Sequence, residues 1–235
     1  MATHTAVSSR EWNDGVLEDT KINMLVHTFR EQGFCTIGNV IPTRVLDALQ
    51  DRMDYDAAHQ AVELKWEERG ERSGAGGHLQ MGIPRMSPFV QKEIVANPII
   101  EQVAVALLGE PREVFLAFFN GNTNIPGSGT QLLHTDGGWD IRTAEEAATA
   151  AEPWPQPTAN LVFNFSTEEI GPQNGPTELW PGTHMDPEFA NDAISNRAEG
   201  SSAEKREAER RSVSPPVLNV LPRGAVSVRD YRLWQ

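Results

Sequence analysis

A histidine and a carboxylate with the spacing of a metal site stand near the middle of the chain. His134 and Asp136 lie in the stretch 131–139, which reads QLLHTDGGW. On an extended backbone, side chains two residues apart project from the same face, so both groups could hold one cation. A histidine plus a carboxylate, with positions left open, is typical of non-haem Fe(II) oxygenases, where a second histidine completes three ligands. The pair alone decides little, because His-x-Asp also occurs on ordinary protein surfaces.

Two further stretches accompany this pair in the second half of the chain. Residues 174–184 read NGPTELWPGTH, and residues 223–234 read RGAVSVRDYRLW. In this order and spacing, the three stretches resemble the phytanoyl-CoA dioxygenase (PhyH) family of Fe(II)- and 2-oxoglutarate-dependent oxygenases. The resemblance begins near Glu31 and runs to the last residue, so it implies a single PhyH-like domain over residues 1–235.

The resemblance implies roles for individual residues. His134 and Asp136 match metal ligands of the family. Gln131 matches a position whose amide contacts 2-oxoglutarate, and Thr177 matches a hydroxyl position near the same cosubstrate. The cofactors implied are therefore Fe(II) and 2-oxoglutarate, with O2 and a small organic molecule as the other reactants. The implied reaction is hydroxylation, desaturation or another oxidation of that molecule.

Four more residues are candidates on the substrate or cosubstrate side. In the family, the residues that follow a mobile loop, here the glycine-rich stretch 70–77, contribute to the cosubstrate pocket. Separately, a tryptophan this close to Asp136 in the sequence could wall the site. The residues at these positions are His78, Gln80, Arg85 and Trp139. Simpler alternatives stay open, since His78 also fits an exposed loop histidine and Trp139 fits ordinary packing.

One position departs from the family pattern. In the family, the strand corresponding to residues 229–234 is followed by the distal metal-binding histidine, a turn, and an arginine that pairs with 2-oxoglutarate. Gln235 stands at the histidine position and ends the sequence. A neutral amide oxygen is a poorer partner for Fe(II) than an imidazole nitrogen. By this comparison, we expect a domain that lacks its C-terminal strands.

The other histidines offer one alternative ligand. His184 is the remaining histidine after Asp136, so it could complete a metal site. It matches, however, the histidine of a Pro-Gly-Ser/Thr-His turn that is not a metal ligand in the family. His4, His27 and His59 are expected to be structural or surface residues.

Several functions remain compatible with these residues. The first is an active oxygenase. The second is a non-catalytic PhyH-like binding or partner protein that has lost the distal ligand. The third is a truncated, inactive fragment whose exposed last strand pairs with another chain. A non-redox lyase or isomerase that uses another metal has less support.

Composition narrows the class of partner. The chain has 20 Lys and Arg against 33 Asp and Glu, and its net charge of −13 disfavours nucleic acid and anionic membranes, which are polyanions. The single cysteine, Cys35, cannot form an intrachain disulfide. The sequence has neither a cationic start followed by an apolar core nor a run of about 18 apolar residues. We therefore expect a cytoplasmic protein, and homo-oligomerisation is left open.

Hydrophobic periodicity predicts helices in the first half and strands in the second. Residues 1–18 are polar and are expected to fray as a flexible N-terminus. The first predicted helix is capped by Asp19 or Thr20 and runs through Phe29, with Gly33 as the stop; the others cover 44–66, 87–93 and 98–108. The predicted strands cover 34–37, 114–119, 160–165, 217–221 and 225–234, with a turn, strand and turn over 174–184.

Two segments are expected to lie outside this framework. The Ala/Glu-rich insert after Asp140 predicts a short helix and a rigid connector over the barrel mouth, and residues 185–212 predict a solvated helix or loop. Helices followed by many short strands favour a mainly β fold with helical buttresses. The specific expectation, which the resemblance also implies, is a double-stranded β-helix, the cupin-like jelly roll.

Overall fold

A four-stranded mixed sheet forms the centre of the computed structural model, which describes residues 4–63, 78–82, 85–109, 114–187 and 202–235. Its strand order is β1-β2-β8-β5. The strands are β1 (His4–Ala6), β2 (Phe34–Gly38), β8 (Val226–Asp230) and β5 (Leu161–Phe165). β1 runs parallel to β2, while β8 is antiparallel to both of its neighbours. The sheet therefore joins the two ends of the chain.

β8 is the most enclosed strand of this sheet. All of its residues are buried, and Val228 lies between Cys35 of β2 and Phe163 of β5 in the ladder. A strand with a partner on each edge and a covered face is held by backbone hydrogen bonds and by burial of apolar surface. β8 is thus a rigid support for the side chains that it carries.

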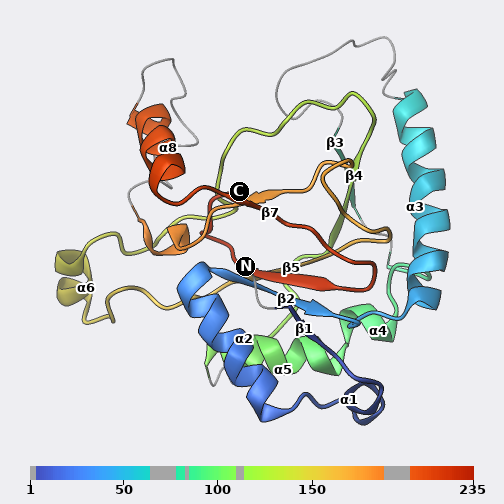
Figure 1. The fold of residues 1–235 in the computed structure, drawn as a ribbon, viewed down its shortest axis with the longest axis horizontal. Helices are drawn as coiled ribbons and strands as arrows, with labels where there is room; N and C mark the ends of the chain where they lie inside the picture. Colours follow the sequence, from blue (N-terminus) through green and yellow to red (C-terminus); the bar gives the residue numbers. More distant parts are fainter. Residues whose placement is uncertain (1–3, 64–77, 83–84, 110–113, 188–201) are drawn as a thin grey trace.

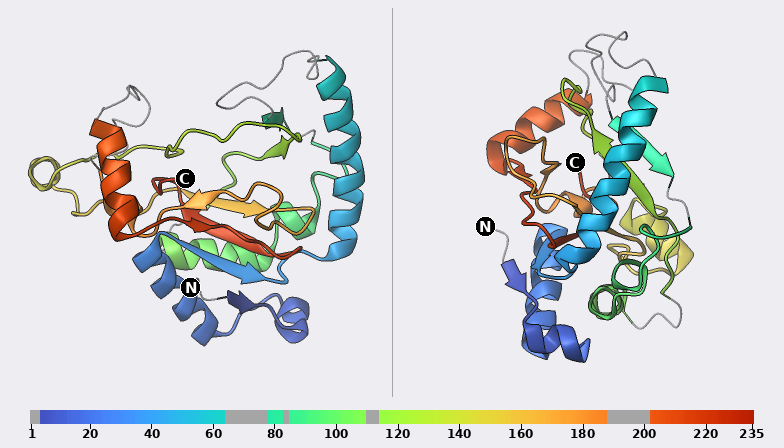
Figure 2. Two further views of the ribbon diagram at one scale, coloured as in Figure 1. Left: turned by 45° about the horizontal axis from the view of Figure 1, so that its top comes forward. Right: turned by 90° about the vertical axis from the view of Figure 1, so that its right-hand side faces the viewer.

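Helices cover one face of the sheet. α2 (Asp19–Gln32) and α5 (Pro98–Leu108) lie below it in the view of Figure 1. Their buried residues Leu25, Phe29, Ile99 and Val103 join Val226 and Val228 in one core. α3 (Thr43–Glu63) stands along one side of the molecule, and the short helix α4 (Lys92–Val95) lies near its lower end (Figure 1, Figure 2).

The predictions for α2, α5 and β2 are confirmed. α3 follows its prediction as far as Glu63. The predicted end of that helix at 66 and the predicted loop 70–77 lie outside the described residues. Gly33 ends α2 in the left-handed region at φ 83°. A Cβ there would also meet the Nδ1 atom of His184 at 2.5 Å, so only glycine fits. The predicted cap at Asp19 or Thr20 was wrong, because Glu18 is the N-cap and Asp19 is already helical.

The expectation of a flexible N-terminus was wrong for residues 4–18. β1 extends the central sheet, and α1 (Ser9–Asp14) begins with a capping box formed by Ser8 and Glu11. Val7 and Leu17 are buried in the core. The polar composition concealed a segment that is held by its tertiary contacts.

The predicted strand over 114–119 was also wrong. These residues have no regular structure, and Phe115 and Phe118 are each 78% exposed. The strand is instead β4 (Asn120–Asn124), which pairs with β3 (His78–Gly82). An apolar run forms a strand only where another strand satisfies its backbone, and within the described chain none pairs with 114–119.

Other differences are smaller. Residues 85–90 form bends and a turn, so the helix predicted over 87–93 is replaced by α4. β5 matches its prediction, and its apolar side chains are half-buried. α6 (Ala144–Ala150) is the short helix expected in the insert; in Figure 1 it projects from the edge of the molecule instead of covering an opening.

The remaining elements surround the C-terminal residues. β6 (Glu178–Leu179) pairs with β7 (Val217–Leu218), and a 3-10 turn, η2, covers Thr183–Met185. α8 (Ser202–Val213) is the solvated helix expected within 185–212, and residues 188–201 lie outside the described residues. The segment 231–235 runs to the middle of the molecule, as the position of the C-terminus shows (Figure 1, Figure 2).

The described chain thus combines one mixed four-stranded sheet and two antiparallel strand pairs with helices packed on the outside. Among the described helices, none is both long and apolar enough to cross a bilayer.

Candidate functional site

Two backbone hydrogen bonds join the segments of the candidate site that contain His134 and Gln235. The amide of His134 donates to the carbonyl oxygen of Gln235 at 2.9 Å, and the amide of Gln235 donates to the carbonyl oxygen of His134 at 2.9 Å. Two residues that exchange both bonds stand directly opposite one another in an antiparallel pair, with side chains on the same face. Gln235 is therefore the residue opposite His134.

Two side chains approach one oxygen of Asp136. The Nε2 atom of Gln235 donates to Oδ1 at 2.8 Å, and the Nε2 atom of His134 lies 3.8 Å from the same oxygen. The sequence predicted that His134 and Asp136 face the same way and that Gln235 takes the third position. The structure brings these three residues together.

The ring of His134 is oriented by its own backbone. Its Nδ1 atom lies 2.7 Å from the carbonyl oxygen of Leu132, which can only accept a hydrogen bond, so Nδ1 carries the proton. Nε2 then presents a lone pair, as in metal-binding histidines whose other nitrogen donates to a carbonyl. The side chains of His134 and Asp136 are 34% and 35% exposed, so solvent and small molecules can reach them.

Gly137 permits the last segment to approach Asp136. Its amide donates to the carbonyl oxygen of Tyr231 at 3.1 Å. A Cβ on Gly137 would lie 1.7 Å from the Tyr231 ring, a distance that no side chain tolerates. A glycine is therefore required directly after the carboxylate, because the aromatic ring occupies the space of a side chain.

Arg229 is a site residue to which the sequence interpretation gave no role. Its Nη2 atom donates to Oδ2 of Asp136 at 2.5 Å, and its Nε atom donates to Oδ1 of Asn164 at 3.2 Å. The side chain is only 6% exposed. The available signal was a charged residue within an apolar strand, since buried arginine needs a counter-ion.

His184 does not join this group. It is 3% exposed and packs against Gly33 and the ring of Phe29, whose centroid lies 6.4 Å away. Burial lowers the pKa of His184, which favours the neutral ring. In the part of the chain that the structure describes, no three His, Cys, Asp or Glu side chains are grouped as a metal site.

The two residues matched to 2-oxoglutarate contacts lie at the surface. Gln131 and Thr177 are both exposed, and the carbonyl oxygen of Thr177 accepts a hydrogen bond from the amide of Asn219 at 2.8 Å. Within the described residues, neither one hydrogen-bonds to His134 or Asp136. Their side chains are free to meet a ligand, and their roles stay predictions.

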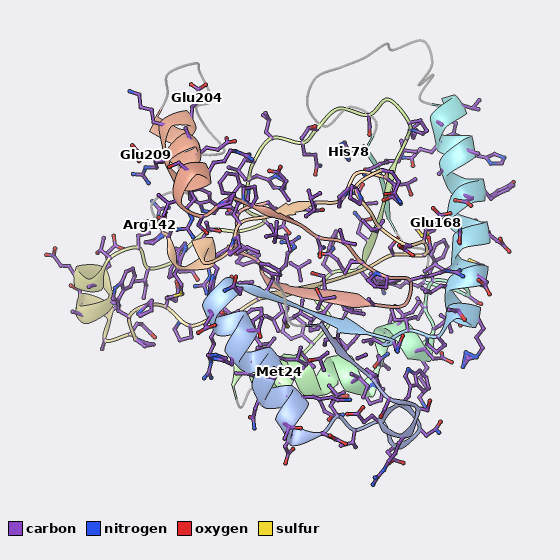
Figure 3. All side chains as sticks on the ribbon, viewed as in Figure 1. Met24, His78, Arg142, Glu168, Glu204 and Glu209 are labelled. Carbon is purple, nitrogen blue, oxygen red and sulfur yellow. The ribbon has the colours of Figure 1, made fainter. Side chains whose placement is uncertain are left out.

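The candidates around residue 80 lie on β3 and just beyond it. The Nε2 atom of His78 lies 2.8 Å from the carbonyl oxygen of Gly129, which ties β3 to the segment before His134. Gln80 stands opposite Asn122 in the β3–β4 pair, and Arg85 is exposed. In Figure 3, His78 lies above the central sheet and Met24 of α2 below it.

Trp139 is buried in an aromatic and cationic stack. The guanidinium of Arg232 lies 4.2 Å from its ring centroid, and the Trp154 ring lies 5.9 Å away. Arg232 is itself paired with Asp230 at 2.6 Å. These contacts favour the packing alternative for Trp139, since its ring is largely covered by protein.

The grouped residues fit a divalent cation. Two neighbouring ligand atoms with bonds of about 2.1 Å are ~3 Å apart at a right angle. The observed 3.8 Å between His134 Nε2 and Asp136 Oδ1 is somewhat wider, and a small shift of the His134 side chain closes it. A half-turn of the Gln235 amide would present Oε1 in place of Nε2. The site therefore offers two good ligands and one weak one.

Comparison with known proteins identifies the family. Residues 29–234 match the family described as Phytanoyl-CoA dioxygenase (PhyH). Among solved structures, the chain is similar to the non-heme alpha ketoglutarate dependent carbocyclase SnoK from nogalamycin biosynthesis, with 19% identity, a TM-score of 0.51, and coverage of 93% of this chain and 76% of that one.

A second similar structure is the epimerase SnoN from the same pathway, with 15% identity, a TM-score of 0.50, and coverage of 92% of this chain and 76% of that one. SnoN in complex with Fe3+, alpha ketoglutarate and nogalamycin RO matches with 16% identity, a TM-score of 0.51, and coverage of 92% and 77%. At these low identities, the structural similarity shows a shared fold. With the family match spanning most of its length, the chain belongs to the phytanoyl-CoA dioxygenase (PhyH) family of Fe(II)- and 2-oxoglutarate-dependent oxygenases.

Proposed function

We propose that this protein is an Fe(II)- and 2-oxoglutarate-dependent dioxygenase that oxidises a small organic molecule on a double-stranded β-helix. One observation carries the proposal: His134 Nε2 and Gln235 Nε2 both approach Oδ1 of Asp136, at 3.8 Å and 2.8 Å. Membership of the PhyH family supports the cofactors and the jelly-roll fold.

Each residue of this group has a defined task in the proposal. His134 presents a lone pair at Nε2 because its Nδ1 proton is held by Leu132. Asp136 supplies the anionic oxygen, and Gln235 supplies a neutral amide oxygen in place of the family histidine. When bound, iron with 2-oxoglutarate and O2 supplies the oxidising power for hydroxylation or desaturation.

Cosubstrate and substrate contacts are assigned by position. The exposed side chains of Gln131 and Thr177 would contact 2-oxoglutarate, and His78, Gln80 and Arg85 would lie on the cosubstrate or substrate side. Trp139 would act as packing behind Asp136. SnoK and SnoN, a carbocyclase and an epimerase, support a small-molecule substrate, as does the net charge of −13. A cytoplasmic location and a homo-oligomer stay predictions.

The direct test is an anaerobic Fe(II) titration in the presence of 2-oxoglutarate. The chelated complex has a visible charge-transfer absorption, and we expect this band to saturate near one iron per chain. His134→Ala is the matched control, since it removes the nitrogen ligand from a partly exposed side chain and should abolish the band. If a folded sample gives no band, the chain is not an iron oxygenase.

A non-catalytic binding protein is the second candidate, and one feature favours it. Both oxygens of Asp136 already have partners in the protein, since Arg229 occupies Oδ2 and Gln235 occupies Oδ1. A carboxylate satisfied in this way is stable without a cation. This candidate predicts that calorimetry detects binding of a small organic acid while the absorption band and 2-oxoglutarate consumption are both absent.

A further inference from the structure

Arg229 contacts the proposed metal ligand Asp136 and has no assigned role in this chain. We propose that Arg229 is a positioning residue, which holds Oδ2 of Asp136 so that only Oδ1 faces the metal. This inference rests on the proposed function and names the residue that organises its site.

The contacts of Arg229 orient the carboxylate. Nη2 donates to Oδ2 of Asp136 at 2.5 Å, while the other oxygen, Oδ1, faces Gln235 and His134. Nε donates to Oδ1 of Asn164 at 3.2 Å, which fixes the rotation of the guanidinium plane. Charge-assisted bonds of this length are strong and directional. Oδ2 of Asp136 is therefore paired with Arg229, while Oδ1 remains on the side of the proposed metal.

The strand that carries Arg229 makes this orientation rigid. In β8, Arg229 stands between Phe34 of β2 and Val162 of β5, so ladders on both edges hold its backbone. Asp136, in contrast, lies on a segment without regular secondary structure. A fixed strand thus positions a side chain from a less regular loop, which is the arrangement that a preorganised site requires.

Burial ties the pair together whether or not a metal is bound. The Arg229 side chain is 6% exposed and an arginine stays protonated, so it needs an anion. Asp136 is the only acidic side chain that it contacts among the described residues. The carboxylate is therefore held in one orientation before a cation arrives.

The positive charge of Arg229 also opposes a nearby cation, so two effects compete. Oδ1 and Oδ2 are opposite corners of the carboxylate, and the anionic group lies between the guanidinium and a cation bound at Oδ1. Removing a partner that orients a metal ligand typically weakens metal binding by about 10- to 100-fold. We expect loss of orientation to outweigh relief of repulsion.

Cobalt binding tests this inference, since Co(II) is stable in air and its visible bands report coordination. Arg229→Met should weaken Co(II) binding by about 10- to 100-fold and shift the bands, because Oδ2 becomes free to bind the metal as well. Arg229→Lys keeps the charge but not the planar fork, so it should recover part of the affinity.

Arg232→Met is the matched control for losing a buried, ion-paired arginine. Arg232 pairs with Asp230 and contacts neither His134 nor Asp136, so this variant should lose stability without changing the Co(II) affinity of the folded protein. If Arg229→Met is too unstable to titrate, Arg229→Lys alone carries the test, and an unchanged affinity in that variant overturns the inference.

The outcomes separate this inference from the proposed function. If the unsubstituted protein fails to bind Co(II), the proposed metal site is refuted. If it binds Co(II) and Arg229→Met binds as tightly or more tightly, the metal site stands and the positioning role is refuted. Equal weakening by Arg229→Met and Arg232→Met would also refute it, because the effect would then be structural.

Discussion

Asp136 should stabilise the metal-free protein as well as bind metal. In the variant Asp136→Ala, Arg229 keeps its charge but loses its only carboxylate contact among the described residues. The Arg229 guanidinium then stays in the interior without a counter-ion, since β8 is paired on both edges and cannot carry it to solvent. We expect a substantial loss in the free energy of unfolding.

The magnitude follows from the burial of the two partners. Breaking a fully buried pair costs about 3–5 kcal/mol, whereas an exposed pair contributes about 0–1 kcal/mol. Arg229 is 6% exposed and Asp136 is 35% exposed, so the pair lies between these limits. We expect Asp136→Ala to cost about 2–3 kcal/mol, which lowers the melting temperature of a chain of this size by ~4–12 °C.

The assay is thermal unfolding followed by circular dichroism in the presence of a chelator. His134→Ala is the control. His134 belongs to the same site, but among the described residues its side chain hydrogen-bonds only to the Leu132 carbonyl oxygen, so a loss of about 1 kcal/mol or less is expected. The double variant Asp136→Ala with Arg229→Met should lose less unfolding free energy than the sum of the losses in the two single variants. Equal melting temperatures for Asp136→Ala and His134→Ala would refute the reasoning.

Three further predictions concern other residues. Gln235→His should tighten Fe(II) binding, because imidazole nitrogen is a better ligand than an amide oxygen; the anaerobic titration checks this, and an unchanged midpoint would show that residue 235 does not face the metal. Burial alone would raise the pKa of Glu11, but hydrogen bonds from Lys21, Ser8 and two backbone amides lower it to about 2, from 4.5. Its contribution to stability is therefore present above pH 4.5 and lost as the pH falls towards 2. Glu11→Gln should lower the urea midpoint of unfolding at pH 7, and that midpoint should fall less between pH 4.5 and 2 than in the unsubstituted protein. A parallel shift of the midpoint at every pH would contradict this. Burial raises the pKa of Cys35 to about 12, so a disulfide reagent should leave the native thiol unmodified and react fully in urea; rapid reaction of the folded protein would argue against the buried strand β2.

Elements with strong local signals were predicted from the sequence. α5 was predicted from its helical periodicity, and Asn97 caps its first turn. The end of α2 followed from Gly33, which adopts the left-handed conformation. These features depend on residues close in sequence, so local patterns are sufficient to find them.

Elements that depend on distant partners were missed. β1 is a strand only because β2 lies beside it, and the apolar run 114–119 is not one because no described strand pairs with it. Local composition indicated the opposite in both cases. Backbone hydrogen bonds in a sheet come from another segment, so strand formation is decided by tertiary structure.

The candidate site divides in the same way. The sequence by itself determined that His134 and Asp136 are two residues apart, a spacing that puts both side chains on one face wherever the backbone is extended. Only the tertiary structure decided that Gln235 meets Asp136 from 99 residues away and that Arg229 meets it from 93 residues away. These contacts depend on the register of the sheet, which the local sequence does not show. The charge of Arg229 requires a partner because folding removes it from water.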